Sequence, residues 1–210
     1  EYLVRVTASD VRLYLYTDTS NYVFHYTSND CLSLNNWHHV VFTYDGNKTD
    51  PIIKIYVDGL LQSSTKSTVG TYAGMSNSSK DLTIGAGLTT GAASFIGQMA
   101  DICIFRTELT NTEVTELYNN GNVVDLVHHS RWADVVSWWK MGDDQDSLGV
   151  NGIKDYKGSN TGSPSQTNPG LSIVSVVDAL GSDVVGGFEA PLPFVFGTVG
   201  RPSFRHGPQD

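Results

Sequence analysis

Two short apolar runs each end in the dipeptide Asp-Gly: WHHVVFTYDG at 37–46 and IKIYVDG at 53–59. Aromatic and β-branched residues in such runs favour strands, and Asp-Gly tolerates the positive φ that a tight turn between strands requires. The sequence therefore predicts strands over 37–44 and 52–57, each followed by a turn. This arrangement restricts the chain to antiparallel β-structure.

Further strand-like segments flank this pair, with period-two alternation or short apolar runs. These segments are 2–17, 22–27, 81–86 and 95–105. One helix is expected in LTNTEVTELYNNG, where Thr110 and Glu113 form a capping box and Gly121 supplies the stop. Many short strands and one short helix predict an all-β protein, a two-sheet antiparallel sandwich.

Composition limits the function classes. The net charge is −9 and the basic residues do not cluster, so neither a nucleic acid nor an anionic membrane is an expected partner. No apolar run approaches the roughly 20 residues of a membrane span. Cys31 and Cys103 leave open either one disulfide or two separate thiols. The chain begins in strand-like sequence without Met or a signal peptide, and we expect an upstream segment.

The order of the segments is also informative. WHHVVFTYDG, IKIYVDG, LTIGAG, FIGQMADICIF and LTNTEVTELYNNG together resemble the laminin G-like, concanavalin A-like lectin/glucanase superfamily over roughly residues 1–121. The resemblance implies a jelly-roll sandwich of two curved antiparallel sheets, with the helix capping one end. The opening strand of that family is absent at residue 1, and a segment that looks like it stands at 136–162.

Three regions follow from this resemblance. Residues 1–121 are interpreted as a concanavalin A-like sandwich that lacks its usual opening strand. Residues 122–180 resemble that strand and either complete the sandwich or start a second unit. Completion is favoured, because a missing edge strand exposes unpaired backbone. Residues 181–210, rich in Gly, Pro and Phe, are interpreted as an extended arm.

The resemblance also implies a structural Ca²⁺. In this superfamily an Asp on the last strand before the helix often joins oxygens of the opening segment around the ion, and Asp101 lies at that position. The segment that looks like the opening contains Asp143, Asp144, Asp146 and Asp155. Carboxylates suit Ca²⁺, and Asp101, Asp143 and Asp155 are the predicted ligands. The alternative is a solvated acidic loop with an Asp that accepts backbone N–H groups.

Aromatic residues offer a second candidate site. Trp138, Trp139 and Tyr156 could form a platform on which a sugar stacks. The alternative is burial, since neighbouring strand residues face opposite ways and at least one Trp is expected in the core. His38 and His39 are also strand neighbours, and so are not expected to share a metal ion.

The glucanases of this fold need two glutamates about 5 Å apart, and no Glu-x-Asp-x-(x)-Glu motif is present, so we expect no enzyme of that type. We expect a non-catalytic surface or structural module of an extracellular or virion assembly, because the chain also resembles phage virion appendage and decoration proteins. Its expected partners are cell-surface glycans or neighbouring subunits, as a homo-oligomer. The alternative is an accessory carbohydrate-binding domain of a glycan-active enzyme.

Overall fold

The computed structural model describes residues 2–6, 10–28, 30–33, 36–77, 81–85, 98–122, 124–141, 152–165, 173–176, 194–196 and 199–200. The first strands in the chain are β1 (Tyr2–Val6), β2 (Val11–Asp18), β3 (Asn21–Thr27), β4 (Val40–Tyr44), β5 (Ile53–Val57), β6 (Leu60–Gln62) and β7 (Ser64–Val69). The later strands are β8 (Leu82–Ile84), β9 (Gln98–Met99), β10 (Ile102–Phe105), β11 (Val135–Trp139), β12 (Gly162–Ser165), β13 (Ile173–Val176), β14 (Phe194–Phe196) and β15 (Val199–Gly200). The helices are α1 (Asn111–Tyr118) and the 3₁₀-turns η1 (Asn119–Gly121), η2 (Leu126–His128) and η3 (Trp132–Asp134).

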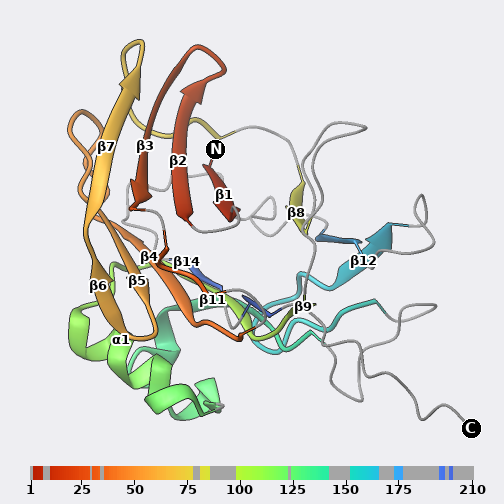
Figure 1. The fold of residues 1–210 in the computed structure, drawn as a ribbon. Coiled ribbons are helices and arrows are strands. Elements are labelled where there is room, and N and C mark those ends of the chain that lie inside the picture. The colour runs from red at the N-terminus through yellow and green to blue at the C-terminus, as the bar shows by residue number, and fades with distance from the viewer. Residues whose placement is uncertain are drawn as a thin grey trace, which may run out of the picture.

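Two larger sheets dominate the molecule (Figure 1). One has the strand order β1-β2-β3-β7, and the other has the order β11-β10-β14-β4-β5-β6. Smaller sheets have the orders β12-β13-β8 and β15-β9, and the described strands pair antiparallel throughout. The prediction of an all-β, two-sheet antiparallel sandwich with one short helix is confirmed, and the jelly-roll connectivity stays a prediction.

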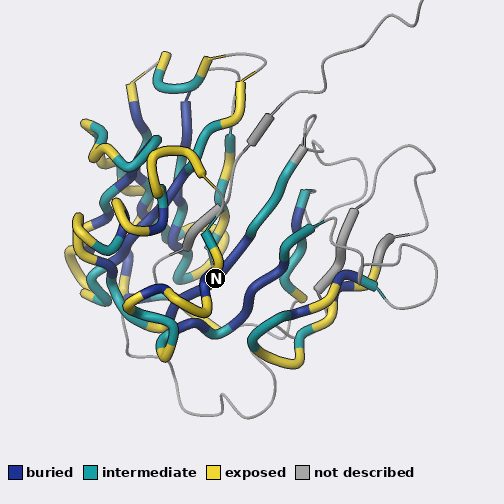
Figure 2. Tube along the Cα trace, turned by 90° about the horizontal axis from the view of Figure 1, so that it is seen from below, coloured by how far each residue is buried: buried dark blue, intermediate teal, exposed yellow. Residues whose placement is uncertain are grey.

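The main core lies between the two larger sheets (Figure 2). In β2, Val11, Leu13 and Leu15 are fully buried, and they alternate with half-buried residues. This alternation is typical of a strand with one face on the core. Phe42 of β4 and Ile55 of β5 meet these residues from the other sheet.

A second core lies on the other face of the six-stranded sheet, where α1 and the turn η2 pack. Val41 of β4 and Tyr56 of β5 belong to this cluster together with Val114 and Leu117 of α1. Because both faces of the sheet are covered, β4 (VVFTY) is buried at every position, including the polar Thr43. This strand begins at Val40, three residues later than predicted.

The Asp-Gly turns behave as their residues require. Asp58 and Gly59 both have positive φ, 51° and 76°, as in a two-residue hairpin turn, and they join β5 to β6. Asp45 opens a longer loop, in which its Oδ1 accepts N–H groups from Asn47 at 3.1 Å and Ile52 at 3.0 Å.

The helix α1 begins as predicted and ends earlier. Its N-cap Thr110 and Glu113 form the expected capping box. Asn119, in the left-handed conformation with φ 44°, ends the helix before Gly121, because Asn tolerates this conformation better than other residues with a β-carbon.

The segments after 121 contribute to the larger sheets. β11 pairs antiparallel with β10 as an edge strand of the six-stranded sheet, and Ile153 lies in the main core. The short strand β14 lies between β10 and β4 and pairs with both. Most of 181–210 lies outside the described residues.

Both cysteines are free thiols. Cys103 is buried in the second core, and the Sγ atom of Cys31 lies 3.0 Å from the hydroxyl of Thr27. Burial raises the pKa of the Cys103 thiol, which keeps it protonated and inert.

Candidate functional site

The strand β11 places its two tryptophans on opposite sides of the six-stranded sheet. Trp139 is fully buried in the main core, where its indole N–H donates to the carbonyl of Asn160 at 2.7 Å. Trp138 is 2% exposed in the second core. Neither ring therefore presents a free face on which a sugar could stack.

Trp138 belongs to an aromatic–lysine cluster, which consists of Trp132, Trp138, Tyr156, Lys140, Lys154 and Lys157. The ammonium of Lys140 lies 4.8 Å from the ring centre of Trp138 and 4.4 Å from that of Tyr156. Tyr156 keeps partial exposure, so of the three predicted ligand-binding residues it alone reaches the surface. A role for Tyr156 in ligand binding stays a prediction.

The carboxylate of Asp155 organises the turn that follows it. Its Oδ1 accepts the backbone N–H groups of Trp138 at 3.0 Å, Lys157 at 2.9 Å and Gly158 at 2.9 Å. Its Oδ2 accepts the N–H group of Asn160 at 3.1 Å. Three donors meet at Oδ1 and one at Oδ2, so this carboxylate holds the backbone around it in place.

Asp101 lies beside the aromatic–lysine cluster. Its Oδ1 accepts the indole N–H of Trp138 at 3.3 Å. Burial raises the pKa of Asp101, opposed in part by that hydrogen bond and by Lys140. Asp143, Asp144 and Asp146 lie outside the described residues.

Calcium binding therefore stays a prediction that these residues do not test. Within the described ranges, no group of three or more His, Cys, Asp or Glu side chains gathers closely enough to hold a metal ion. The nearby ammonium of Lys140 also opposes a second cation beside Asp101.

A different aromatic surface lies on the other large sheet. It consists of Tyr14 and Tyr16 of β2 and Tyr22, Phe24 and Tyr26 of β3, and we call it the outer aromatic face. These residues alternate with the buried Val11, Leu13, Leu15 and Val23, so they occupy the face of the sheet turned away from the core.

The rings of the outer aromatic face form cross-strand pairs. Tyr14 and Phe24 are in register and stack with centroids 4.7 Å apart and planes 16° apart. Tyr16 and Tyr22 are also in register, 5.0 Å apart and tilted by 43°. Each of these residues is half-buried although the face lies outside the core, because the stacked rings cover part of one another's surface. The face thus combines apolar ring surface with phenol hydroxyls.

The borders of this face are cationic on one side and polar on the other. On β1, Leu3 lies opposite Tyr14 and Arg5 lies opposite Arg12. Leu3 and Arg5 are exposed. Arg12 donates to Asp10 at 2.7 Å and lies 5.6 Å from the ring centre of Tyr26. On β7, the register partners of Phe24 and Tyr26 are Ser67 and Thr65.

Sequence reasoning did not single out this surface, although the signal was present. Aromatic residues recur at every second position in both segments, at 14 and 16 and at 22, 24 and 26. Antiparallel pairing of two consecutive strands brings such residues together on one face, once the register is known.

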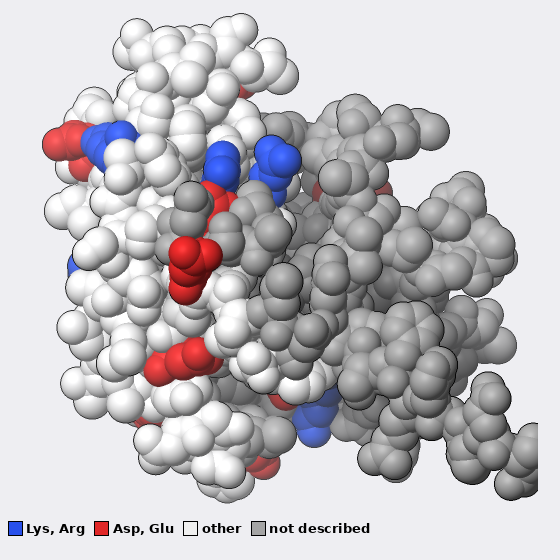
Figure 3. Space-filling view, in the orientation of Figure 1, with Lys and Arg blue, Asp and Glu red and all other residues white. Residues whose placement is uncertain are grey.

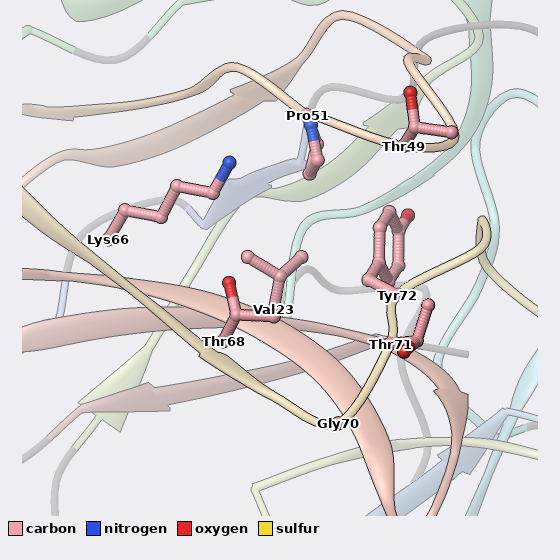
Figure 4. A pocket seen from close by; sticks show the side chains of 8 residues that line it. All are labelled: Val23, Thr49, Pro51, Lys66, Thr68, Gly70, Thr71 and Tyr72. Atoms are coloured by element: carbon pink, nitrogen blue, oxygen red, sulfur yellow. The ribbon is translucent and has the colours of Figure 1, made fainter.

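A small cavity of about 230 Å³ lies near the edge of the sandwich (Figure 4). Its lining residues are Val23, Thr49, Pro51, Lys66, Thr68, Gly70, Thr71 and Tyr72. The ammonium of Lys66 is paired with Asp50. The volume is below the roughly 300–1,000 Å³ of most ligand pockets.

The described glutamates are engaged elsewhere. Glu108 accepts a hydrogen bond from Lys54 at 2.8 Å, Glu113 completes the capping box, and Glu116 accepts the N–H of Ser130 at 2.7 Å. Among the described residues, no two glutamates are therefore free to form the paired carboxylates of a retaining glucanase. Charged side chains are also sparse among the described residues on the face shown in Figure 3.

Comparison with known proteins gives one finding. A family model described as the concanavalin A-like lectin/glucanases superfamily matches residues 1–115 of the 210. No curated protein and no solved structure matches the chain significantly.

Proposed function

Because the chain belongs to the concanavalin A-like lectin/glucanases superfamily, we propose that it is a saccharide-binding surface module without glycosidase activity. The superfamily supports a carbohydrate-binding or structural role. The finer proposal rests on the outer aromatic face, the one described surface that gathers five aromatic side chains outside both cores.

The chemistry of this face matches that of a saccharide. A pyranose ring presents apolar C–H groups between hydroxyls, and Tyr offers an apolar ring with a hydroxyl at its tip. The hydroxyls of Ser67 and Thr65 extend the polar surface beside the rings. Arg5 adds a positive charge at the border, beside Arg12, whose charge is paired with Asp10, and this suits a sugar with a carboxylate substituent.

The wider setting is also part of the proposal. A module of this kind would act outside the cell or on a virion surface, with cell-surface glycans or neighbouring subunits as partners, as a homo-oligomer. The alternative remains an accessory binding domain of a glycan-active enzyme. The net charge of −9 disfavours nucleic acid, and the described part of the chain has no helix long and apolar enough to cross a membrane.

A glycan array with the full chain, followed by calorimetric titration of the best ligand, tests this function. We expect Tyr14→Ala and Tyr22→Ala each to weaken binding by roughly tenfold or more, as buried anchor residues do. Trp37→Ala is the matched control, because this aromatic residue is 48% exposed and lies outside the face. An array without binding, or ligand affinity that both tyrosine variants retain, would overturn the proposal.

A further inference from the structure

We propose that Ser33, His38 and Asp58 form a nucleophilic serine site that accepts acyl groups from small esters and hydrolyses them. The site is separate from the outer aromatic face, and the inference does not depend on saccharide binding. It rests on three side chains that the β5–β6 turn and the segment before β4 bring into one hydrogen-bonded line.

The distances are those of a serine–histidine–aspartate relay. The Oγ of Ser33 lies 2.8 Å from the Nε2 of His38, and the Nδ1 of His38 lies 2.8 Å from the Oδ2 of Asp58. Both contacts fall within the range that proton transfer and orientation of a catalytic base require.

Neighbouring groups orient the protons correctly. The carboxylate of Asp58 can only accept, so Nδ1 of His38 carries the hydrogen and, in the neutral ring, Nε2 is the acceptor. The backbone N–H and the carbonyl oxygen of Ser33 lie 3.0 Å and 3.2 Å from the same Nε2. The side-chain amide of Asn36 donates to the Oγ of Ser33 at 2.9 Å. With that amide at one side of Oγ, the hydroxyl hydrogen of Ser33 points to Nε2, whose lone pair it shares with the backbone N–H of the same residue.

Asp58 is a positioning residue, and two hydrogen bonds to the backbone of His39 fix its place. Its Oδ1 accepts the N–H of His39 at 2.9 Å, and its N–H donates to the carbonyl of His39 at 2.8 Å. Because Asp58 sits in the hairpin turn with φ 51°, few other residues suit this position. Its second oxygen therefore faces His38 from a fixed place.

The exposure of the site indicates its substrates. Ser33 is exposed, and the side chain of His38 is 13% exposed, so the nucleophile is accessible while the base is largely screened from water. The surface is open at the serine, which favours short acyl groups such as acetyl esters over substrates that need a deep pocket.

The reaction balances without a cofactor. Ser33 Oγ attacks the ester carbonyl as its proton moves to His38 Nε2, the C–O bond to the alcohol breaks, and the alcohol leaves with that proton. A water molecule then attacks the acyl-serine, gives its proton to His38, and the carboxylic acid leaves as Ser33 is reprotonated. The sum is ester plus water giving acid plus alcohol.

The test uses the full chain, a fluorophosphonate probe and p-nitrophenyl acetate. We expect mass spectrometry to find the probe on Ser33, and hydrolysis to fall roughly tenfold or more in Ser33→Ala and His38→Gln. Ser130→Ala is the matched control and should keep full activity, because the hydroxyl of this serine donates a hydrogen bond to the carboxylate of Glu116 and not to an imidazole.

Two results would overturn the inference. One is a wild-type chain that takes no probe at Ser33. The other is a Ser33→Ala chain that hydrolyses the ester as fast as the wild type, since free histidines also cleave activated esters. Thermal unfolding of each variant is the control. A Tm within a few degrees of that of the wild type shows that a lower rate comes from lost chemistry and not from unfolding of the loop that His38 anchors.

Discussion

Asp155 shows how one carboxylate can determine a local fold. Replacing it by Ala removes the acceptor of four backbone N–H groups around a buried strand end, and we expect a loss of about 2–4 kcal/mol in the free energy of unfolding. Urea denaturation measures this loss. Asp125→Ala is the control and should cost less than about 1 kcal/mol, because that exposed carboxylate accepts one N–H at 3.2 Å.

The same variant separates structure from metal binding. If Asp155 acts only on the backbone, the loss is equal with and without a chelator. A loss that disappears in chelator would instead assign Asp155 to a cation, as the sequence predicted.

His39 predicts a pH dependence of stability. Burial lowers the pKa of His39 from 6.5 to about 4, while Asp58 opposes the shift. The unfolded chain therefore takes up a proton near pH 6.5 that the folded chain refuses until about pH 4. The contribution of His39 is complete above pH 6.5 and is lost as the pH falls toward 4, by about 2–3 kcal/mol.

Urea denaturation between pH 7 and 4 measures this effect. We expect His39→Gln to flatten the fall in stability, and His128→Gln, whose side chain is 83% exposed, to leave it unchanged. Equal slopes for all three chains would contradict the neutral, buried state of His39.

At the scale of the residue, sequence reasoning succeeded where the chemistry is local. The opposite orientation of Trp138 and Trp139 followed from strand geometry, and both lie in cores. Sequence reasoning could not show that both tryptophans would be buried, because the burial of Trp138 depends on α1 and η2 covering the outer side of the six-stranded sheet. The line from Ser33 to Asp58 was likewise hidden, since 25 positions separate residues that only the hairpin brings together.

At the scale of the element, α1 offers a direct test of capping. Thr110 and Glu113 exchange hydrogen bonds across the first turn, with Thr110 N–H donating to Glu113 Oε2 at 2.7 Å. We expect Thr110→Ala to lower stability by about 1 kcal/mol, since the N3 amide loses its acceptor. Thr110→Ser keeps the hydroxyl and should cost less than half as much. Similar losses in the two variants would show that the cap does not act through this hydroxyl.

The helix also shows the limit of element prediction. Its start was predictable because a capping box is a pattern of a few adjacent residues. The prediction ended the helix at Gly121, but Asn119 adopts the left-handed conformation that ends it two residues earlier. The strands around it were recognisable by composition, whereas their order in the sheets depended on contacts distant in the chain.

At the scale of the whole molecule, β14 makes the end of the chain part of the fold. It pairs with β10 on one side and β4 on the other, so truncation after residue 180 should leave each of these two strands with one unpaired edge. We expect a lower Tm and aggregation in light scattering. Truncation after residue 200 is the control and should keep the Tm. A soluble, equally stable chain ending at 180 would support the extended arm instead.

The composition and the order of motifs were enough to predict the all-β sandwich and its family, because they report on burial and turns along the chain. The outer aromatic face required the register of β2 and β3, in which Tyr14 pairs with Phe24 and Tyr16 with Tyr22. A candidate site on a sheet is thus a property of pairing, which the sequence leaves implicit.

The central claim is that this face binds saccharides. The most direct measurement is NMR chemical-shift mapping of the full chain during titration with the saccharide selected on the array. The account predicts that the largest shifts occur in β2 and β3, at alternate positions around Tyr14 and Phe24, with few changes in the aromatic–lysine cluster. Shifts confined to the cavity near Tyr72 or to Tyr156 would place binding elsewhere and contradict the account.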